Sequence, residues 1–136
     1  MEIILATQNS GKIEEFNELA KDTKLNFVPV PSNPSFPEET GSTFFENATI
    51  KANFIFSLTG RTCLGDDSGL EVDALNGKPG VHSSRFSKEA TDKSNMDKLL
   101  NELSGVSCKD RSARFKCCLV LIQENVNNLI STEGVI

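Results

Sequence analysis

The sequence predicts one domain of α/β or α+β class, built on a single β-sheet, for three reasons. The chain has 136 residues, which is enough for one domain and too few for two ordinary ones. Hydrophobic residues make up 38% of the chain and charged residues 24%, a balance that permits a buried core and argues against disorder. Strand-like and helix-like patterns also mix along the whole length instead of falling into two blocks.

The first half of the chain is expected to form a strand, a helix, a short strand, a loop and a second helix. Short apolar runs predict the strands, and apolar residues at helical spacing predict the helices. Thr43 and Glu46 have the spacing of a capping box, in which a hydroxyl and a carboxylate each accept from a free backbone N–H at a helix start. Gly60 is expected to end that helix. In chain order, the expected elements are 3–7, 13–20, 25–28, 31–41 and 43–60.

The second half is expected to contain several strands and one helix. Residues 66–69 are expected to form a turn between two short strands, because aspartates and glycines are typical turn residues. The expected helix should bury a face made of Met96, Leu99, Leu100 and Leu103. The other expected elements are strands at 62–65 and 70–74, a loop at 76–87, the helix from about 91 to 105, and strands at 113–121 and from 129 onward.

The chain is acidic, and this restricts its partners. A net charge of −5 and a pI near 4.9 give no electrostatic footprint for duplex nucleic acid or an anionic membrane. Nine Phe without Trp or Tyr disfavour a stacking surface for single-stranded nucleic acid. We therefore expect neither nucleic acid nor a membrane as a partner. A polyanionic substrate would have to be held by local lysines or by a bound cation.

The four cysteines and the N-terminus favour a cytoplasmic protein. Cys117 and Cys118 are adjacent in an apolar strand, which is poor disulfide geometry, and no C-x-x-C spacing exists for zinc. With Cys63 and Cys108 they are expected to be reduced thiols. The N-terminal apolar run is too short for a signal peptide and lacks a basic region before it.

A first candidate site follows the first strand, where a polar loop opens a helix. The free N–H groups and the positive dipole end of a helix attract phosphate, and a lysine there adds a full charge. The segment is not a P-loop, because the first glycine of that motif is missing. The alternative is an ordinary helix start with a solvated lysine. The candidate residues are Thr7, Gln8, Asn9, Ser10, Gly11 and Lys12.

Two further clusters carry carboxylates. The loop residue Glu39 precedes a helix that contains Lys51, and acids beside a lysine suit a site where a hard cation and a phosphate meet. Asp66 and Asp67, with Ser68, are flanked by glycines that allow close backbone approach, and they are the best candidates for a metal ligand or general base. The alternatives are a solvated surface for the first cluster and an Asx turn without function for the second.

His82 and Arg85 lie in the loop expected at 76–87. Because His82 is the single histidine, a histidine-based zinc site or a catalytic triad is hard to build. Arg85 is the better partner for a phosphate or carboxylate, since its guanidinium presents a planar pair of donors.

Taken together, these segments resemble the inosine triphosphate pyrophosphatase family, the Ham1-like hydrolases of deaminated purine nucleotides. The resemblance runs through essentially the whole chain in the family's order, and four linked motifs are more specific than any one of them. The matching segments are 5–12; 38–41 with 46–48 and 51–52; 66–70 with 72–73; and 77–86, followed by 113–115.

The resemblance implies a long, bent, mixed β-sheet flanked by helices, and a homodimer. It implies Mg²⁺-dependent hydrolysis of ITP, dITP and XTP to the monophosphate and pyrophosphate, which cleanses the nucleotide pool. Residues 7–12 would line the triphosphate, and Lys12 and Lys51 would neutralise its charge. Glu39 and Asp67 would hold Mg²⁺. Asp67 would also accept a proton from the attacking water, Asp66 would support these acids, and Ser68 would touch the nucleotide.

The sequence also departs from the family. Relatives carry a Gly-Phe-Gly-Tyr-Asp-Pro type segment, a later lysine and a Ser-His-Arg motif that read the base, and residues 1–136 contain none of these. We therefore expect a single domain that lacks the C-terminal part of the family domain. The alternative function is that of a catalytically impaired remnant that binds nucleotides without selecting a base. The related Maf-type pyrophosphatases fit less well, because the Asp-Asp-Ser-Gly and Glu-Asn-Ala patterns point elsewhere.

Overall fold

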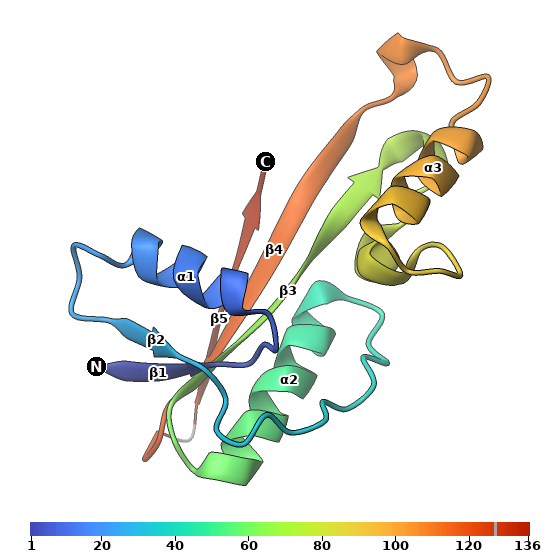
Figure 1. The fold of residues 1–136 in the computed structure, drawn as a ribbon. Helices are drawn as coiled ribbons and strands as arrows, with labels where there is room; N and C mark the ends of the chain where they lie inside the picture. Colours follow the sequence, from blue (N-terminus) through green and yellow to red (C-terminus); the bar gives the residue numbers. More distant parts are fainter. Residues whose placement is uncertain (127) are drawn as a thin grey trace.

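Two long antiparallel strands, β3 and β4, run through the whole structure and connect its two ends (Figure 1). The structure is a computed structural model that describes residues 1–126 and 128–136. Its sheet is mixed and has the strand order β2-β1-β3-β4-β5. The strands are β1 (Glu2–Leu5), β2 (Asn26–Val28), β3 (Cys63–Val72), β4 (Ala113–Ile122) and β5 (Leu129–Val135). The helices are α1 (Ser10–Leu19), α2 (Phe44–Thr59) and α3 (Asp92–Glu102), with 3₁₀ turns η1 (Asp73–Leu75), η2 (Gly80–Arg85) and η3 (Cys108–Asp110).

The predicted turn at 66–69 is wrong, because these residues lie in the middle of β3. The strand pairs with β4 without interruption, from Cys63 opposite Ile122 to Val72 opposite Ala113. This continuous ladder outweighs the local turn preference of aspartate and glycine. On its other edge β3 pairs with the parallel strand β1 only as far as Leu64. Beyond that point the aspartates lie on a strand edge that β1 leaves open.

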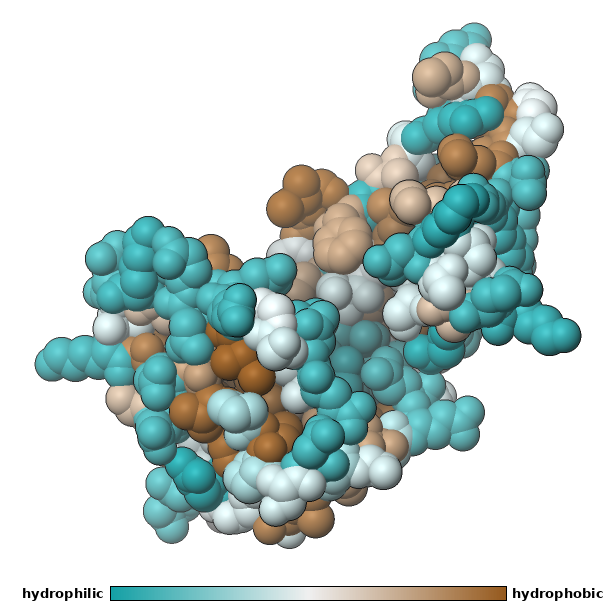
Figure 2. All heavy atoms as spheres, in the orientation of Figure 1, coloured by the Kyte–Doolittle hydropathy of each residue, from teal (hydrophilic) through white to brown (hydrophobic). Residues whose placement is uncertain are grey.

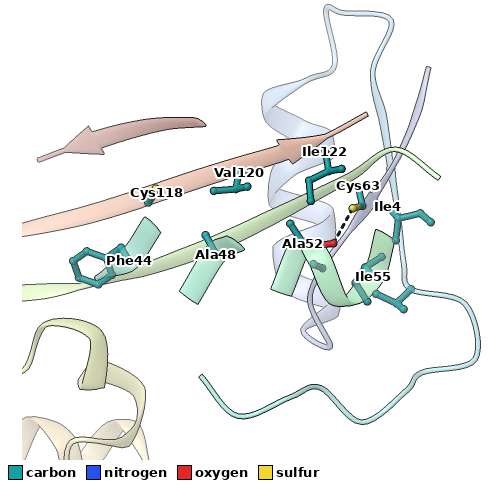
Figure 3. Packing of buried hydrophobic residues seen from close by; sticks show 11 residues of the cluster. Ile4, Phe44, Ala48, Ala52, Ile55, Cys63, Cys118, Val120 and Ile122 are labelled. Carbon is teal, nitrogen blue, oxygen red and sulfur yellow. Dashed lines mark hydrogen bonds between the residues drawn. The ribbon is translucent and has the colours of Figure 1, made fainter. Parts of the chain in front are cut away.

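Each face of the sheet is covered by a different helix. Ile3 and Leu5 of β1 point to one face and pack with residues of α1, whereas Ile4 points to the other face and packs with α2. This alternation follows from the two-residue repeat of a strand. The larger cluster joins α2 to β3 and β4 (Figure 3), and its labelled members are Ile4, Phe44, Ala48, Ala52, Ile55, Cys63, Cys118, Val120 and Ile122. The mixed sheet flanked by helices is therefore confirmed.

The start and end of α2 follow the sequence signals with one difference. The Thr43 side chain accepts from the Glu46 N–H, and Gly60 ends the helix in the left-handed conformation with φ of 64°. The prediction that the Glu46 carboxylate accepts a hydrogen bond from the Thr43 backbone N–H is wrong. The Glu46 carboxylate instead accepts from the N–H of Ser42 at 2.6 Å and from its hydroxyl at 2.9 Å. The carboxylate thus holds the chain one residue earlier than a capping box would.

The far end of β3 and β4 carries η2 and α3, which form a separate part of the molecule in Figure 1. The helix expected from about residue 91 begins at Asp92, and Thr91 and Ser94 cap it reciprocally. The expected buried face of this helix is only partly present. Leu103 is buried, but Met96 and Leu100 are each 57% exposed. Half of the loop expected at 76–87 is the 3₁₀ turn η2, which packs on β3.

The four cysteines are free thiols with different environments. Cys63 is buried and donates a hydrogen bond to the carbonyl of Ala52 at 3.2 Å (Figure 3). Burial raises the pKa of the Cys63 thiol to about 11, whereas Cys108 is exposed. Within the described residues, no helix is long and apolar enough to cross a bilayer.

These environments predict the order in which the thiols react. Because the thiolate is the nucleophile, iodoacetamide at pH 8 should modify Cys108 first and leave Cys63 unmodified in the folded protein. Peptide mass mapping after timed quenching measures the order. In a fully denatured sample Cys63 and Cys108 should react at similar rates. Equal rates in the folded protein would contradict the buried position of Cys63.

Candidate active site

A cleft of about 500 Å³ opens where β1 ends and β3 continues. Figure 2 shows the surface hollowed between the part that holds α1 and α2 and the part that holds α3. Residues from both parts line the cleft, and they come from seven separate stretches of the chain. The charged lining residues are Lys12, Glu39, Lys51, Asp66, Asp67 and Asp92.

Asp66 and Lys12 meet on the α1 side of the sheet. Asp66 points to the same face as Leu64, which packs beneath α1. Its carboxylate is 4% exposed and forms an ion pair with the Lys12 ammonium group, which is 32% exposed. Lys12 lies in the first turn of α1, so that the helix start brings its charge to the aspartate. Lys12 keeps enough exposure to meet a ligand in the cleft.

Asp67 and Lys51 meet on the opposite, α2 side. The Lys51 Nζ lies 3.5 Å from Asp67 Oδ1 and 3.4 Å from Glu39 Oε1. Lys51 is only 12% exposed, so this ammonium group is held between two acids rather than solvated. The side chains of Asp66 and Asp67 therefore point to opposite faces of β3, and each forms an ion pair with a different lysine.

Burial dominates the electrostatics of Asp67. It raises the pKa of the Asp67 carboxyl above its ordinary value, and the charge of Lys51 acts against this rise. The nearby Glu39 carboxylate raises the same pKa further, while a hydrogen bond from Asn47 lowers it. A carboxylate with a raised pKa is a better proton acceptor than an exposed one. Asp67 is therefore the strongest general-base candidate in the cleft.

Glu39 is fixed from two directions. Besides its contact with Lys51, its backbone carbonyl accepts a hydrogen bond from Arg85 Nη2 at 3.1 Å, and its carboxylate lies 3.7 Å from Arg85 Nη1. Arg85 thus contacts a carboxylate, one of the two partner types expected for it. Earlier in the same loop, the carbonyl of Pro34 accepts a hydrogen bond from Gln8 Nε2, which lies between β1 and α1, at 3.0 Å. The loop before α2 is therefore tied to both sides of the cleft.

Only some residues of the first candidate segment, 7–12, lie in the cleft. Thr7, Gln8, Asn9 and Lys12 line the cleft, whereas Ser10 and Gly11 are not part of its lining. Asn9 is the N-cap of α1, where its Oδ1 accepts from the Gly11 N–H, so that only the Nδ2 end of its amide can donate to a ligand. Ser68, which shares the face of Asp66, does line the cleft.

The glycines around the aspartates allow neighbouring elements to approach β3. A Cβ atom at Gly65 would lie 2.1 Å from the carbonyl oxygen of Ala48 in α2. A Cβ atom at Gly69 would lie 2.3 Å from the carbonyl oxygen of Gly80 in η2. The close backbone approach expected from these glycines is thus confirmed. Because these positions lack side chains, α2 and η2 pack directly against the strand that carries the acids.

Asn47 has contacts in the site that the residue pattern alone did not assign. The buried side chain donates to Asp67 Oδ2 at 3.2 Å and accepts from the Gly41 N–H at 2.7 Å. The signal available in the sequence was its spacing of four residues from Lys51, which places both on one helix face. Phe36 and Phe115 also line the cleft, and nothing in their local sequence pattern distinguishes them from core residues.

The lining of the cleft suits a divalent cation bound together with a phosphate ligand. It contains two lysines and four acids, so a polyphosphate would meet an excess of negative charge without added cations. Among the described residues no group of three or more His, Cys, Asp or Glu side chains could hold a metal alone. Mg²⁺ usually takes one or two carboxylates and completes its shell with waters and substrate phosphates. Glu39 and Asp67, which share Lys51, fit that arrangement.

Residues 3–136 match the Ham1 family. The chain is a member of that family. It is 48% identical over 131 residues to a dITP/XTP pyrophosphatase of Coxiella burnetii, and the match covers 94% of this chain and 64% of that protein. It is 46% identical to a dITP/XTP pyrophosphatase of Bacillus licheniformis, with 99% of this chain and 72% of that protein covered.

Solved structures of Ham1 proteins have the same fold. The Ham1 protein of Coxiella burnetii superposes with a TM-score of 0.87 at 45% identity, covering 99% of this chain and 70% of that one. The Ham1 protein of Staphylococcus aureus gives a TM-score of 0.84 at 37% identity, covering 100% of this chain and 70% of that one. The family resemblance and the fold expected from it are therefore confirmed.

Proposed function

We propose that this Ham1 chain hydrolyses deaminated purine nucleoside triphosphates, namely ITP, dITP and XTP, to the monophosphate and pyrophosphate. One observation carries the proposal: Lys12, Lys51, Glu39 and Asp67 line a single cleft although they come from distant parts of the sequence. The names of the Coxiella and Bacillus relatives, which are 48% and 46% identical, support the substrate class. The role that follows is cleansing of the nucleotide pool.

In the proposed reaction, Thr7, Gln8, Asn9 and Lys12, which line the cleft, contact the triphosphate, and Lys12 and Lys51 neutralise its charge. Both amines are paired with acids in the free protein, so each exchanges part of that contact for a phosphate oxygen. Asp67 accepts a proton from water as the water oxygen bonds to phosphorus. The anhydride bond between the α- and β-phosphates breaks, and pyrophosphate leaves. Asp66 supports this arrangement by orienting Lys12, and Ser68 contacts the nucleotide.

The proposal includes Mg²⁺, held by Glu39 and Asp67. When bound, it would withdraw charge from the phosphate oxygens and offset the excess of acids in the cleft. Lys51 then serves a second purpose, because its contact with both acids keeps them close while no cation is present. Arg85 holds the backbone of Glu39 and so limits the movement of that acid.

The test is release of pyrophosphate from ITP. We expect turnover with Mg²⁺, its loss when EDTA removes the metal, and its return when Mg²⁺ is restored, because the lysines alone cannot balance the charge of a triphosphate. A coupled pyrophosphate assay measures all three. GTP and ATP should be hydrolysed more slowly. Folded protein that releases no pyrophosphate from ITP would contradict the enzymatic proposal for this chain.

The rival proposal, a remnant that binds nucleotides without catalysis, makes a different prediction. Calorimetric titration with ITP, GTP and inorganic triphosphate should then give similar affinities for all three. An enzyme selective for deaminated purines should bind ITP most tightly. The titration is informative even in a sample without turnover, since it measures binding alone.

We further propose that the protein acts as a homodimer in the cytoplasm. The family resemblance supports the dimer, and the four free thiols support a reducing compartment. Light scattering coupled to size-exclusion chromatography gives the mass of the assembly. A mass equal to 14.8 kDa at micromolar concentration would contradict the dimer.

A further inference from the structure

The amide side chain of Asn47 joins two parts of the cleft that are far apart in the sequence. Its Oδ1 accepts a hydrogen bond from the Gly41 N–H at 2.7 Å, and its Nδ2 donates to Asp67 Oδ2 at 3.2 Å. Gly41 lies in the loop that carries Glu39, whereas Asp67 lies within β3. One side chain therefore connects the segments that supply the two acids around Lys51.

Burial of the Asn47 side chain makes the loss of either hydrogen bond costly. Asn47 is 0% exposed, so an amide group that loses either partner finds no water to replace it. The two bonds use opposite ends of the amide, one as acceptor and one as donor, so the side chain satisfies both in one orientation only. A shift of Gly41 is thus transmitted to the group that contacts Asp67.

Gly41 fits tightly against the same amide. A Cβ atom at this position would lie 2.5 Å from Asn47 Oδ1 and 2.6 Å from the Cβ of Glu46. A side chain at residue 41 would therefore displace the Asn47 amide, and it would also crowd the side chain of Glu46. This contact offers a second way to disturb the connection, from the loop side.

We propose that Asn47 is a positioning residue that holds the Glu39 segment in a fixed relation to the Asp67 carboxylate. The inference rests on the proposed function. Asn47 and Lys51 lie one turn apart on α2 and contact different oxygens of Asp67, Oδ2 and Oδ1. Lys51 supplies charge to both acids, while Asn47 supplies the fixed geometry. Neither role requires Asn47 to touch the substrate.

The test compares Asn47→Ala and Gly41→Ala with the matched control Asn17→Ala. Asn17 also makes two hydrogen bonds through its amide, to the N–H and carbonyl of Phe27 at 2.8 Å each, but it joins α1 to β2 away from the cleft. With ITP we expect kcat to fall about 100-fold in both cleft variants, with KM changed less than about threefold. Asn17→Ala should lose stability and keep its kcat.

A purely structural role for Asn47 would give the opposite result. Asn47→Ala with a kcat close to that of the parent protein, or with losses matched by Asn17→Ala at equal stability, would overturn the proposal. If Asn47→Ala does not fold, Asn47→Asp replaces it. That variant keeps the volume and the acceptor for Gly41 but replaces the donor to Asp67 with a carboxylate oxygen that repels it, and kcat is expected to fall at least as far as in Asn47→Ala.

A second readout separates this inference from the proposed function. We expect Asp67→Ala to speed hydrogen exchange at the Gly41 N–H, because Asn47 loses the partner that fixes its orientation. Two-dimensional NMR measures this exchange without any turnover. A parent protein that releases no pyrophosphate contradicts the enzymatic proposal alone. Unchanged exchange at Gly41 in Asp67→Ala contradicts the connection through Asn47.

Discussion

Asp67→Asn is expected to abolish pyrophosphate release from ITP, with a fall in kcat of about 1,000-fold or more. The amide cannot accept a proton from water, and it is a weaker partner for a cation than the carboxylate. The free energy of unfolding should change by about 1 kcal/mol or less, because Lys51 keeps its contact with Glu39 and a neutral amide costs less to bury than a carboxylate. Initial-rate assays and urea unfolding measure the two effects.

The control for this prediction is Asp97→Asn. Asp97 is an exposed carboxylate of α3 that pairs with Lys93 at 2.6 Å, outside the lining of the cleft. The same loss of one negative charge should leave turnover unchanged there. Retention of turnover in Asp67→Asn would remove Asp67 from the role of general base. A large loss of stability would instead show that the carboxylate mainly supports the fold.

The parts of the fold that depend on local chemistry were predictable from the sequence. Thr43 and Thr91 cap the helices that begin after them, and Gly60 ends α2, because each signal acts within a few residues. The strands of the core also followed from their apolar runs. Five of the six charged residues that line the cleft were among the predicted site residues, whereas Asp92 was not.

What could not be predicted depends on pairing between distant segments. The chain from Asp66 to Gly69 has turn-like composition, and only its ladder with β4 makes it a strand. Because a turn was predicted there, the main feature of the site was missed. Neighbouring residues of a strand point to opposite faces, so Asp66 pairs with Lys12 on one face and Asp67 pairs with Lys51 on the other. Local sequence also could not assign Met96 and Leu100, because burial of a helix face depends on what packs against it.

The second large effect concerns Gly65, where β3 crosses beneath α2. Gly65→Ala is expected to lower the free energy of unfolding by about 3 kcal/mol, at the upper end of the range for overpacked sites. The added Cβ would lie 2.1 Å from the carbonyl oxygen of Ala48 and 3.0 Å from the Cβ of Ala52. The first of these atoms is backbone, so no rotamer change relieves the clash, and α2 must move away from the strand.

Because α2 carries Asn47 and Lys51, the same movement should weaken catalysis. The matched control is Gly134→Ala in β5, where a Cβ would meet nothing within 4 Å. Urea unfolding of both variants, followed by circular dichroism, should show a lower midpoint for Gly65→Ala and a change within about 0.5 kcal/mol for Gly134→Ala. Equal midpoints would mean that α2 does not press on β3 at Gly65. A glycine before the paired aspartates would then not be needed for close packing, and the contact between Lys51 and Asp67 would require another cause.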